Sequence, residues 1–167
     1  MLSCYESDLL IMDNIEQSFV AIKPDAVQRG LTADIILRFE QKGLKLVALK
    51  MLRVTEALAH QHYAEHIGKD FFPSLVNFIT SGPLIAMVWE GRDAIAVCRR
   101  VIGNTDPEKA EPGTIRFDFG QAPQRNVIHG CDSAESAKRE IALYFKPEEV
   151  LTGWDRDIDK WIVPGIL

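Results

Sequence analysis

The sequence predicts an α+β domain, in which additional helices pack on a four-stranded antiparallel sheet with a β-α-β-β-α-β core. Two observations lead to this fold class. Short apolar runs of strand length alternate with segments whose apolar residues recur at helical spacing. The length of 167 residues suits one domain, which buries roughly 70% of the surface that its unfolded chain exposes. We therefore expect a hydrophobic core that needs neither a metal nor a disulfide for its stability.

Four apolar runs bounded by Gly, Pro or polar residues are expected to form the strands. They span residues 18–23, 44–54, 83–91 and 126–129. The first strand is expected to end at Lys23, because Pro24 has no N–H to donate to a neighbouring strand.

Helical segments follow each strand. Thr32 and Thr55 are expected to cap the first two helices, and further helices are expected near 70–82, 93–102 and 133–145. From Gly103 to Arg125 the periodicity fails and Gly and Pro recur, so we expect a long loop without regular elements. A loop of this length inside a compact domain is usually functional.

Composition excludes several classes of protein. The chain is 47% hydrophobic and 26% charged, as in ordinary soluble proteins, and we expect no membrane partner. Its net charge of −5 argues against binding along a nucleic-acid backbone, so any anion must be held by a local cluster of Lys and Arg. The three cysteines are widely spaced and odd in number, which favours free thiols and a cytoplasmic location.

Residues 1–16 are set apart from the domain, which is expected to span 17–167 as one unit. The apolar patch from Leu9 to Met12 lacks the basic flank and the cleavage site of a signal peptide. Residues 1–16 are therefore either an extra N-terminal arm or the product of a start placed too early, with Met12 as the true initiator.

The stretch NVIHGCDS places His129 at a corner between a strand and a helix. Gly130 allows a sharp turn, and Asp132 is expected to cap the helix while Glu135 reaches back to it. The free N–H groups of such a helix start favour an anion beside the imidazole. Glu140, two turns into the helix, is placed to hold one ring nitrogen and leave the other as a nucleophile.

Cations at the ends of elements and in loops suit a polyphosphate ligand. They are Lys23, Arg99, Arg100, Arg116 and Arg125. The sequence contains neither G-x-x-x-x-G-K-[ST] nor G-x-G-x-x-G, so the phosphates must be held by side chains.

Seven segments, in order and spacing, make the chain resemble the nucleoside diphosphate kinase family from about residue 17 to 161. They are FVAIKPDAVQRGL, RFEQKGLKLV, HYAEH, FFPSLVNFITSGPLIAMVWEG, PGTIR, RNVIHGCDS and ESAKREIALYF. The resemblance implies a ferredoxin-like fold and transfer of the γ-phosphate of a nucleoside triphosphate, mainly ATP, to a nucleoside diphosphate through a phosphohistidine. It also implies Mg²⁺ held mainly by the nucleotide phosphates and water, and a homo-oligomer, with a hexamer favoured and a tetramer as the alternative.

The same resemblance implies a role for each matching residue. His129 corresponds to the phosphorylated histidine, Glu140 to the glutamate that orients it, and Tyr63 to a tyrosine near the catalytic pocket. Lys23 is expected to contact the transferred phosphate and the sugar. The remaining nucleotide contacts are expected from Phe71 on the base, Arg99, Thr105 and Arg116 on the phosphates, and Asn126 on the ribose.

Two positions depart from the family pattern: Cys131 replaces a serine expected to support the glutamate, and Phe117 replaces a small residue and could crowd the loop.

Three rival hypotheses remain. Cys131 could be the nucleophile of a Cys/His enzyme. His62 and His66, one helical turn apart, could hold zinc with a third ligand. The domain could also be a non-catalytic ligand-binding or assembly module.

Overall fold

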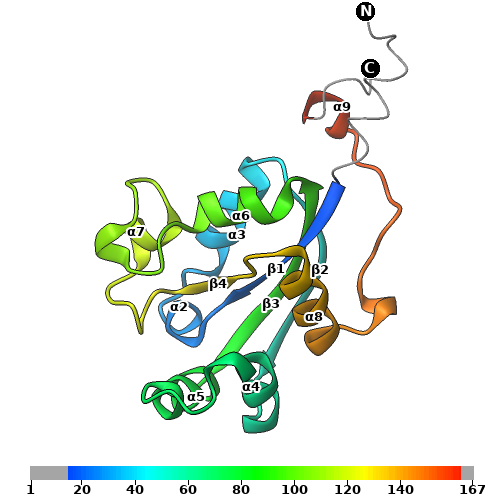
Figure 1. Ribbon diagram of the computed structural model, residues 1–167. Coiled ribbons are helices and arrows are strands. Elements are labelled where there is room, and N and C mark those ends of the chain that lie inside the picture. The colour runs from blue at the N-terminus through cyan, green and yellow to red at the C-terminus, as the bar shows by residue number, and fades with distance from the viewer. Residues whose placement is uncertain (1–14, 163–167) are drawn as a thin grey trace, which may run out of the picture.

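The computed structural model describes residues 15–162, which form a four-stranded antiparallel sheet in the order β2-β3-β1-β4 with helices around it (Figure 1). The strands are β1 (Ile15–Ile22), β2 (Lys45–Arg53), β3 (Pro83–Arg92) and β4 (Ile128–Gly130). β1 lies between β3 and β4 and pairs antiparallel with both. This arrangement confirms the expected ferredoxin-like α+β fold.

Both faces of the sheet are covered, because alternate residues of the central strands enter two separate apolar layers. Phe19 and Val88 enter one layer, whereas Val20 and Met87 enter the other, and all four side chains are fully buried. Helices α4, α5 and α8 contribute to the first layer, and α2, α3, α6 and α7 to the second.

The helices are α2 (Pro24–Gln28), α3 (Thr32–Gln41), α4 (Glu56–His62), α5 (Phe72–Thr80), α6 (Ala94–Ile102), α7 (Ile115–Phe119), α8 (Ala134–Tyr144) and α9 (Asp159–Ile162). Short 3₁₀ turns occupy Ala64–His66, Pro107–Lys109 and Pro147–Glu149. In the stretch from 15 to 162, none of the helices combines the length and the apolar character that a membrane span requires.

Two of the three expected helix caps are displaced by one position. Thr55 caps α4 as expected, with its Oγ1 accepting the N–H of Leu58 at 3.2 Å. Thr32 is instead the first residue of α3, and Leu31 occupies the N-cap without a side-chain bond.

The corner before α8 is also capped differently from the prediction. Ser133, and not Asp132, is the N-cap, and its Oγ accepts the N–H of Ser136 at 3.1 Å. Glu135 is therefore one position too early to complete a capping box. The sequence offers two capping residues in succession, and only the backbone decides between them.

The segment between Gly103 and Arg125, expected to be irregular, contains the 3₁₀ turn Pro107–Lys109 and the helix α7. The Thr114 hydroxyl caps α7 by accepting the N–H of Phe117 at 3.4 Å. The prediction was wrong here because elements of about one turn are too short to show a periodicity.

Strands β1 and β4 begin at other residues than expected. β1 begins at Ile15 and pairs Glu16 with Gly91, so two residues that we assigned to the N-terminal arm belong to the sheet. The rest of the expected arm, 1–14, and the last residues of the expected domain, 163–167, lie outside the described residues. β4 begins only at Ile128, because Val127 has a φ of 63°, which is incompatible with an extended strand.

The left-handed glycine that ends α6 should be sensitive to substitution. Gly103 has a φ of 86°, and a Cβ there would lie 2.5 Å from Thr114 Oγ1. Gly103→Ala therefore adds a clash to the backbone strain, which is about 1–3 kcal/mol in this essentially glycine-only conformation. We expect a larger loss of unfolding free energy in urea than for Gly30→Ala, where φ is 72° and nothing lies within 4 Å. Equal losses would contradict a packing role for Gly103.

Candidate active site

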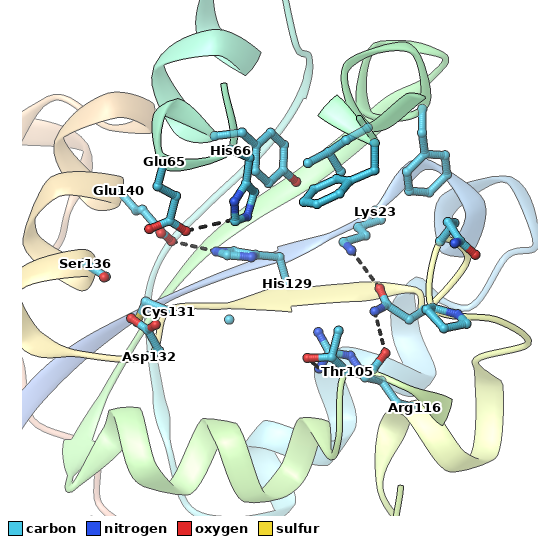
Figure 2. Close-up of a pocket in the computed structure, with 18 of the residues that line it drawn as sticks. Lys23, Glu65, His66, Thr105, Arg116, His129, Cys131, Asp132, Ser136 and Glu140 are labelled. Atoms are coloured by element: carbon cyan, nitrogen blue, oxygen red, sulfur yellow. Dashed lines mark hydrogen bonds and ion pairs between the residues drawn. The ribbon is translucent and has the colours of Figure 1, made fainter. Parts of the chain in front are cut away.

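His129 lies in β4 opposite Ala21 of β1, and its ring is held by a carboxylate from α8 (Figure 2). The His129 Nε2 lies 2.7 Å from the Glu140 Oε2. An ionised carboxylate only accepts hydrogen bonds, so Nε2 carries the proton and Nδ1 keeps its lone pair. The pair thus leaves Nδ1 as the nucleophilic atom of the ring.

Glu140 is held on both of its oxygens. It is only 4% exposed, and burial raises the pKa of its carboxyl while His62 and Arg139 act in the opposite direction. Its Oε1 accepts a longer bond of 3.4 Å from Arg139 Nη2. With each oxygen engaged, the carboxylate cannot rotate freely away from His129.

His129 is a neutral imidazole at physiological pH. Burial lowers its pKa to about 3, helped by the nearby positive charges of Lys23, Arg116 and Arg99. A protonated ring would have no free lone pair, so this depression keeps Nδ1 available for attack.

A chain of polar contacts ties the end of β1 to the loop before α7. Lys23 Nζ donates to Asn126 Oδ1 at 2.7 Å, and Asn126 Nδ2 donates to the Thr105 carbonyl at 2.8 Å. Lys23 is buried, and burial together with Arg116 lowers its pKa to about 8. This ammonium group is therefore charged at neutral pH, although its environment opposes the charge.

Arg116 is a buried guanidinium whose bonds run mainly to backbone carbonyls. Its Nη1 donates to Gly103 O at 3.0 Å and its Nη2 to Ile128 O at 2.8 Å, while Thr105 Oγ1 lies 3.4 Å away. Burial and the charge of Arg99 lower its pKa to about 10. Since the described residues give Arg116 no carboxylate partner, an anion is the natural complement to this charge.

These groups line one cavity of about 570 Å³, a size that suits a small-molecule ligand. Its opposite wall is aromatic and basic. Phe71, at the start of α5, is 52% exposed, and the Arg125 guanidinium lies 4.2 Å from the centre of the Phe78 ring. The cavity therefore joins a cationic end near His129 to an accessible aromatic surface.

The structure brings together the nine residues to which the resemblance gave a role, and what each does there stays a prediction. All nine line this cavity: Lys23, Tyr63, Phe71, Arg99, Thr105, Arg116, Asn126, His129 and Glu140. Sequence reasoning missed other lining residues, among them Glu65, Ser74, Pro123, Asp132, Ser136 and Arg139. Residues of this kind belong to no apolar pattern and so carry no periodic signal that could have identified them.

His62, one residue of the hypothetical zinc pair, is a packed side chain. It is 4% exposed, and its ring centre lies 4.7 Å from that of His129. His66 packs against Tyr63 and Phe71, whereas His62 contacts Tyr63 and His129, so only His62 of the suspected zinc pair lies against the catalytic histidine. The helical spacing of Ala59 and His62, both buried, is the signal that could have revealed this.

Cys131 does not contact Glu140, the glutamate that the residue at this position was expected to support. Its thiol lies 3.2 Å from Ser18 Oγ, and no hydrogen bond joins it to Glu140 among the residues from 15 to 162. Burial raises its pKa, which keeps the sulfur protonated and argues against the rival hypothesis of a cysteine nucleophile. Phe117, the other departure, is 48% exposed and is not one of the residues lining the cavity.

The fold and the cavity define a class of protein, an α+β domain with a carboxylate-held histidine beside a cavity whose cationic side chains suit a phosphorylated ligand. Comparisons with known proteins make this assignment specific. The family model for nucleoside diphosphate kinase matches residues 16–150.

Relatives and solved structures agree with that match. The nucleoside diphosphate kinase of Carboxydothermus hydrogenoformans is 56% identical over 89% of this chain and 99% of its own length. That of Thermosynechococcus vestitus is 59% identical over 89% of this chain and 98% of its own length. The structure of the Halobacterium salinarum enzyme in complex with CDP matches with a TM-score of 0.85 and 53% identity, covering 88% of this chain and 97% of that one.

This chain belongs to the nucleoside diphosphate kinase family, and it is a phosphotransferase that acts on nucleotides. The non-catalytic module that we kept as an alternative is not favoured by these findings.

Replacing the thiol near the catalytic pair should have a small effect. A neutral hydrogen bond contributes about 1 kcal/mol, and ~1.4 kcal/mol corresponds to tenfold in rate. Since Cys131 contacts Ser18 and not Glu140, we expect Cys131→Ser to change turnover by no more than roughly tenfold. Turnover at saturating nucleotide checks this, with Cys98→Ser as the matched buried control. A fall beyond about a hundredfold in Cys131→Ser alone would restore the cysteine nucleophile.

The pH dependence of the enzymatic rate should reflect the protonation of Lys23. Its pKa is lowered to about 8, so its charge is present below that pH and is lost as pH rises through it. We expect kcat/KM, which reflects the free enzyme, to fall above about pH 8, while kcat falls less because bound phosphate stabilises the ammonium. In Lys23→Arg the fall should move to higher pH, although the activity is lower. An unchanged profile would show that another group controls this limb.

Proposed function

We propose that His129 is the residue that carries the phosphate in a ping-pong reaction between nucleoside tri- and diphosphates. The observation that carries this proposal is the 2.7 Å bond from His129 Nε2 to Glu140, which leaves a neutral Nδ1 beside a basic cavity. The Nδ1 lone pair attacks the γ-phosphorus in line, an Nδ1–P bond forms, and the bond to the bridging oxygen of the β-phosphate breaks. The diphosphate leaves, a second one binds in its place, and the step reverses.

Glu140 has a defined part in this cycle. When Nδ1 is phosphorylated, positive charge develops on the ring, and the carboxylate bound to Nε2–H stabilises it. The same bond fixes the tautomer before the attack. Tyr63, 7% exposed and lining the cavity, is proposed to help to shape the pocket around the ring.

The cations are proposed to bind the phosphates. Lys23 is assigned to the transferred phosphate and the sugar, and Arg99, Thr105 and Arg116 to the remaining phosphates. Asn126 is assigned to the ribose hydroxyl, and its contact with Lys23 at 2.7 Å places these two groups together. The burial of Arg116 without a carboxylate partner supports its assignment to an anion.

Nucleotide kinases of this kind generally need a divalent cation, and we propose that it is Mg²⁺. The donor set of the cavity fits an ion carried mainly by phosphate oxygens and water, because basic groups surround the proposed phosphate end. Bound there, Mg²⁺ would neutralise part of the phosphate charge. The side chains Lys23, Arg99 and Arg116 position the nucleotide around it.

We also propose a homo-oligomer, a hexamer in preference to a tetramer, and a cytoplasmic location. The outer strand β2 supports association, because Leu49 and Met51 are 48% and 59% exposed on it. The free, buried thiols of Cys98 and Cys131 are compatible with a reducing compartment.

The phosphohistidine is the direct test of this proposal. Incubation with γ-labelled ATP should place an acid-labile, base-stable label on His129, and ADP should remove it. His129→Ala should show neither label nor exchange, while its urea unfolding curve stays close to that of the wild type. A His129→Ala variant with near-normal turnover would overturn the assignment.

The aromatic wall makes a second prediction. We expect Phe71 to stack on the base, and stacking on a ring contributes roughly 1–3 kcal/mol for any base. Phe71→Ala should therefore raise KM for adenine, guanine, cytosine and uracil nucleotides by similar factors, whereas Phe71→Tyr keeps the stack and should change little. A loss confined to one base would contradict stacking as the mode of recognition.

A further inference from the structure

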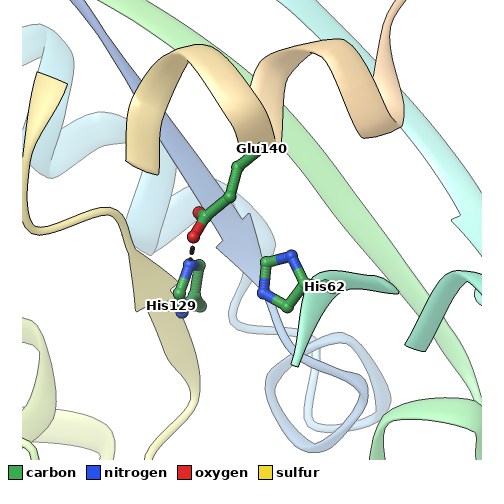
Figure 3. Close-up of side chains that lie close together, drawn as sticks. All are labelled: His62, His129 and Glu140. Atoms are coloured by element: carbon green, nitrogen blue, oxygen red, sulfur yellow. Dashed lines mark hydrogen bonds and ion pairs between the residues drawn. The ribbon is translucent and has the colours of Figure 1, made fainter. Parts of the chain in front are cut away.

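His62 is a buried polar residue to which the proposed reaction gives no part. It ends α4 beside the catalytic pair, with its ring nearly perpendicular to that of His129 and the ring centres 4.7 Å apart (Figure 3). Its Nδ1 is buried and has no hydrogen-bond partner within the described part of the chain. A buried nitrogen of this kind is costly unless something binds it, which points to a ligand.

The three side chains together offer a set of metal ligands. Each side chain offers one ligand atom, and these three atoms, from His62, His129 and Glu140, lie within 4.8 Å of one another. Two imidazoles and a carboxylate are the ligand set of one type of catalytic zinc site, where ligand atoms about 2.0–2.1 Å from the ion lie roughly 3.3 Å apart. The most widely spaced atoms would therefore close by at most about 1.5 Å, while His129 Nε2 and Glu140 Oε2, now 2.7 Å apart, would separate by about 0.6 Å.

We propose that His62, His129 and Glu140 bind Zn²⁺, or a similar borderline divalent cation, and that the bound ion switches the enzyme off. The binding site stands on the geometry of these three side chains alone. The loss of activity rests on the proposed function, because it requires His129 to be the nucleophile.

Inhibition follows from the tautomer of His129. Zn²⁺ binds an unprotonated nitrogen, and the nitrogen that faces Glu140 is Nε2, which carries the proton in the free enzyme. When the ion takes the place of this proton, Nε2 releases it to solvent, and the ring stays neutral only by taking up a proton on Nδ1. The lone pair that attacks phosphorus is then lost. Conversely, a phosphate on Nδ1 retains the proton on Nε2, so the phosphorylated enzyme should bind the ion less tightly.

The surroundings set limits on which ion binds. Lys23, Arg116 and Arg99 face His129, and Arg139 contacts Glu140, so positive charge opposes any cation. A hard ion such as Mg²⁺ gains little from two imidazoles and prefers oxygen ligands, whereas Zn²⁺ suits this set. The site should therefore discriminate against the Mg²⁺ that accompanies the nucleotide.

The experiment separates binding from inhibition. Equilibrium dialysis of the full chain against Zn²⁺ without nucleotide measures the dissociation constant and the stoichiometry, and the visible spectrum of Co²⁺ reports the coordination geometry. The variants are His62→Phe, which keeps a ring in the packed position, and His62→Gln in case the first does not fold. His60→Gln is the matched control, because His60 lies on the same helix but packs on Phe72.

We expect about one Zn²⁺ per chain in the wild type and in His60→Gln, and at least tenfold weaker binding in either His62 variant. The rate of phosphate exchange with Mg²⁺ should stay within a few-fold of wild type in the His62 variants, and also when His66 is replaced in addition. Added Zn²⁺ should not inhibit exchange in these variants. Equal Zn²⁺ affinity in wild type and His62 variants would overturn the site. If the His62 variants bind Zn²⁺ more weakly but are inhibited by it as strongly as the wild type, the proposed switch is overturned. If the wild type shows no phosphate exchange, the proposed function is overturned, and the dialysis still tests the metal site.

Discussion

The hydrogen bond between His129 Nε2 and Glu140 Oε2 is the interaction on which the rest of the site depends. It joins a three-residue strand to a helix that begins four residues later, and it fixes both the direction of the ring and its tautomer. The fold supplies the geometry: β1 pairs with β4 to place the histidine, and the Ser133 cap starts α8 so that Glu140 faces it. A carboxylate that is 4% exposed is stable there only because both oxygens are engaged.

The charges around this pair suit an anion, which residues 15–162 do not provide. Lys23 and Arg116 are buried, both pKa values are lowered by burial, and each side chain bonds to neutral oxygens. The same charges lower the pKa of His129 and so maintain its nucleophilic form. A polyphosphate therefore does two things on binding: it relieves the repulsion among the cations, and it brings phosphorus to the neutral ring.

Much of this architecture could be predicted from the sequence, because the strands and the longer helices carry clear apolar patterns. The pairing of His129 with Glu140 was also within reach, since both lie on one strand-to-helix unit. The helix α7 was not, because an element of about one turn is too short to show a periodicity. The displaced caps at Thr32 and Asp132 were not, because the backbone conformation decides at which residue a helix starts. The contacts of His62 and of the Cys131 thiol were missed for a different reason. Their neighbours, His129 and Ser18, lie far away in the sequence, and a local pattern can indicate that a side chain is buried but not which distant residue it contacts.

The protonation state of His129 is the central claim, and ¹⁵N NMR of histidine-labelled protein measures it directly. With the signals assigned by comparison with His129→Ala, the pH 7 spectrum should show Nε2 protonated and Nδ1 unprotonated, and Glu140→Gln should disturb this tautomer. Titration should leave the ring neutral well below pH 6, since its pKa is lowered to about 3. A ring protonated on both nitrogens at pH 7, or carrying its proton on Nδ1, would contradict the account.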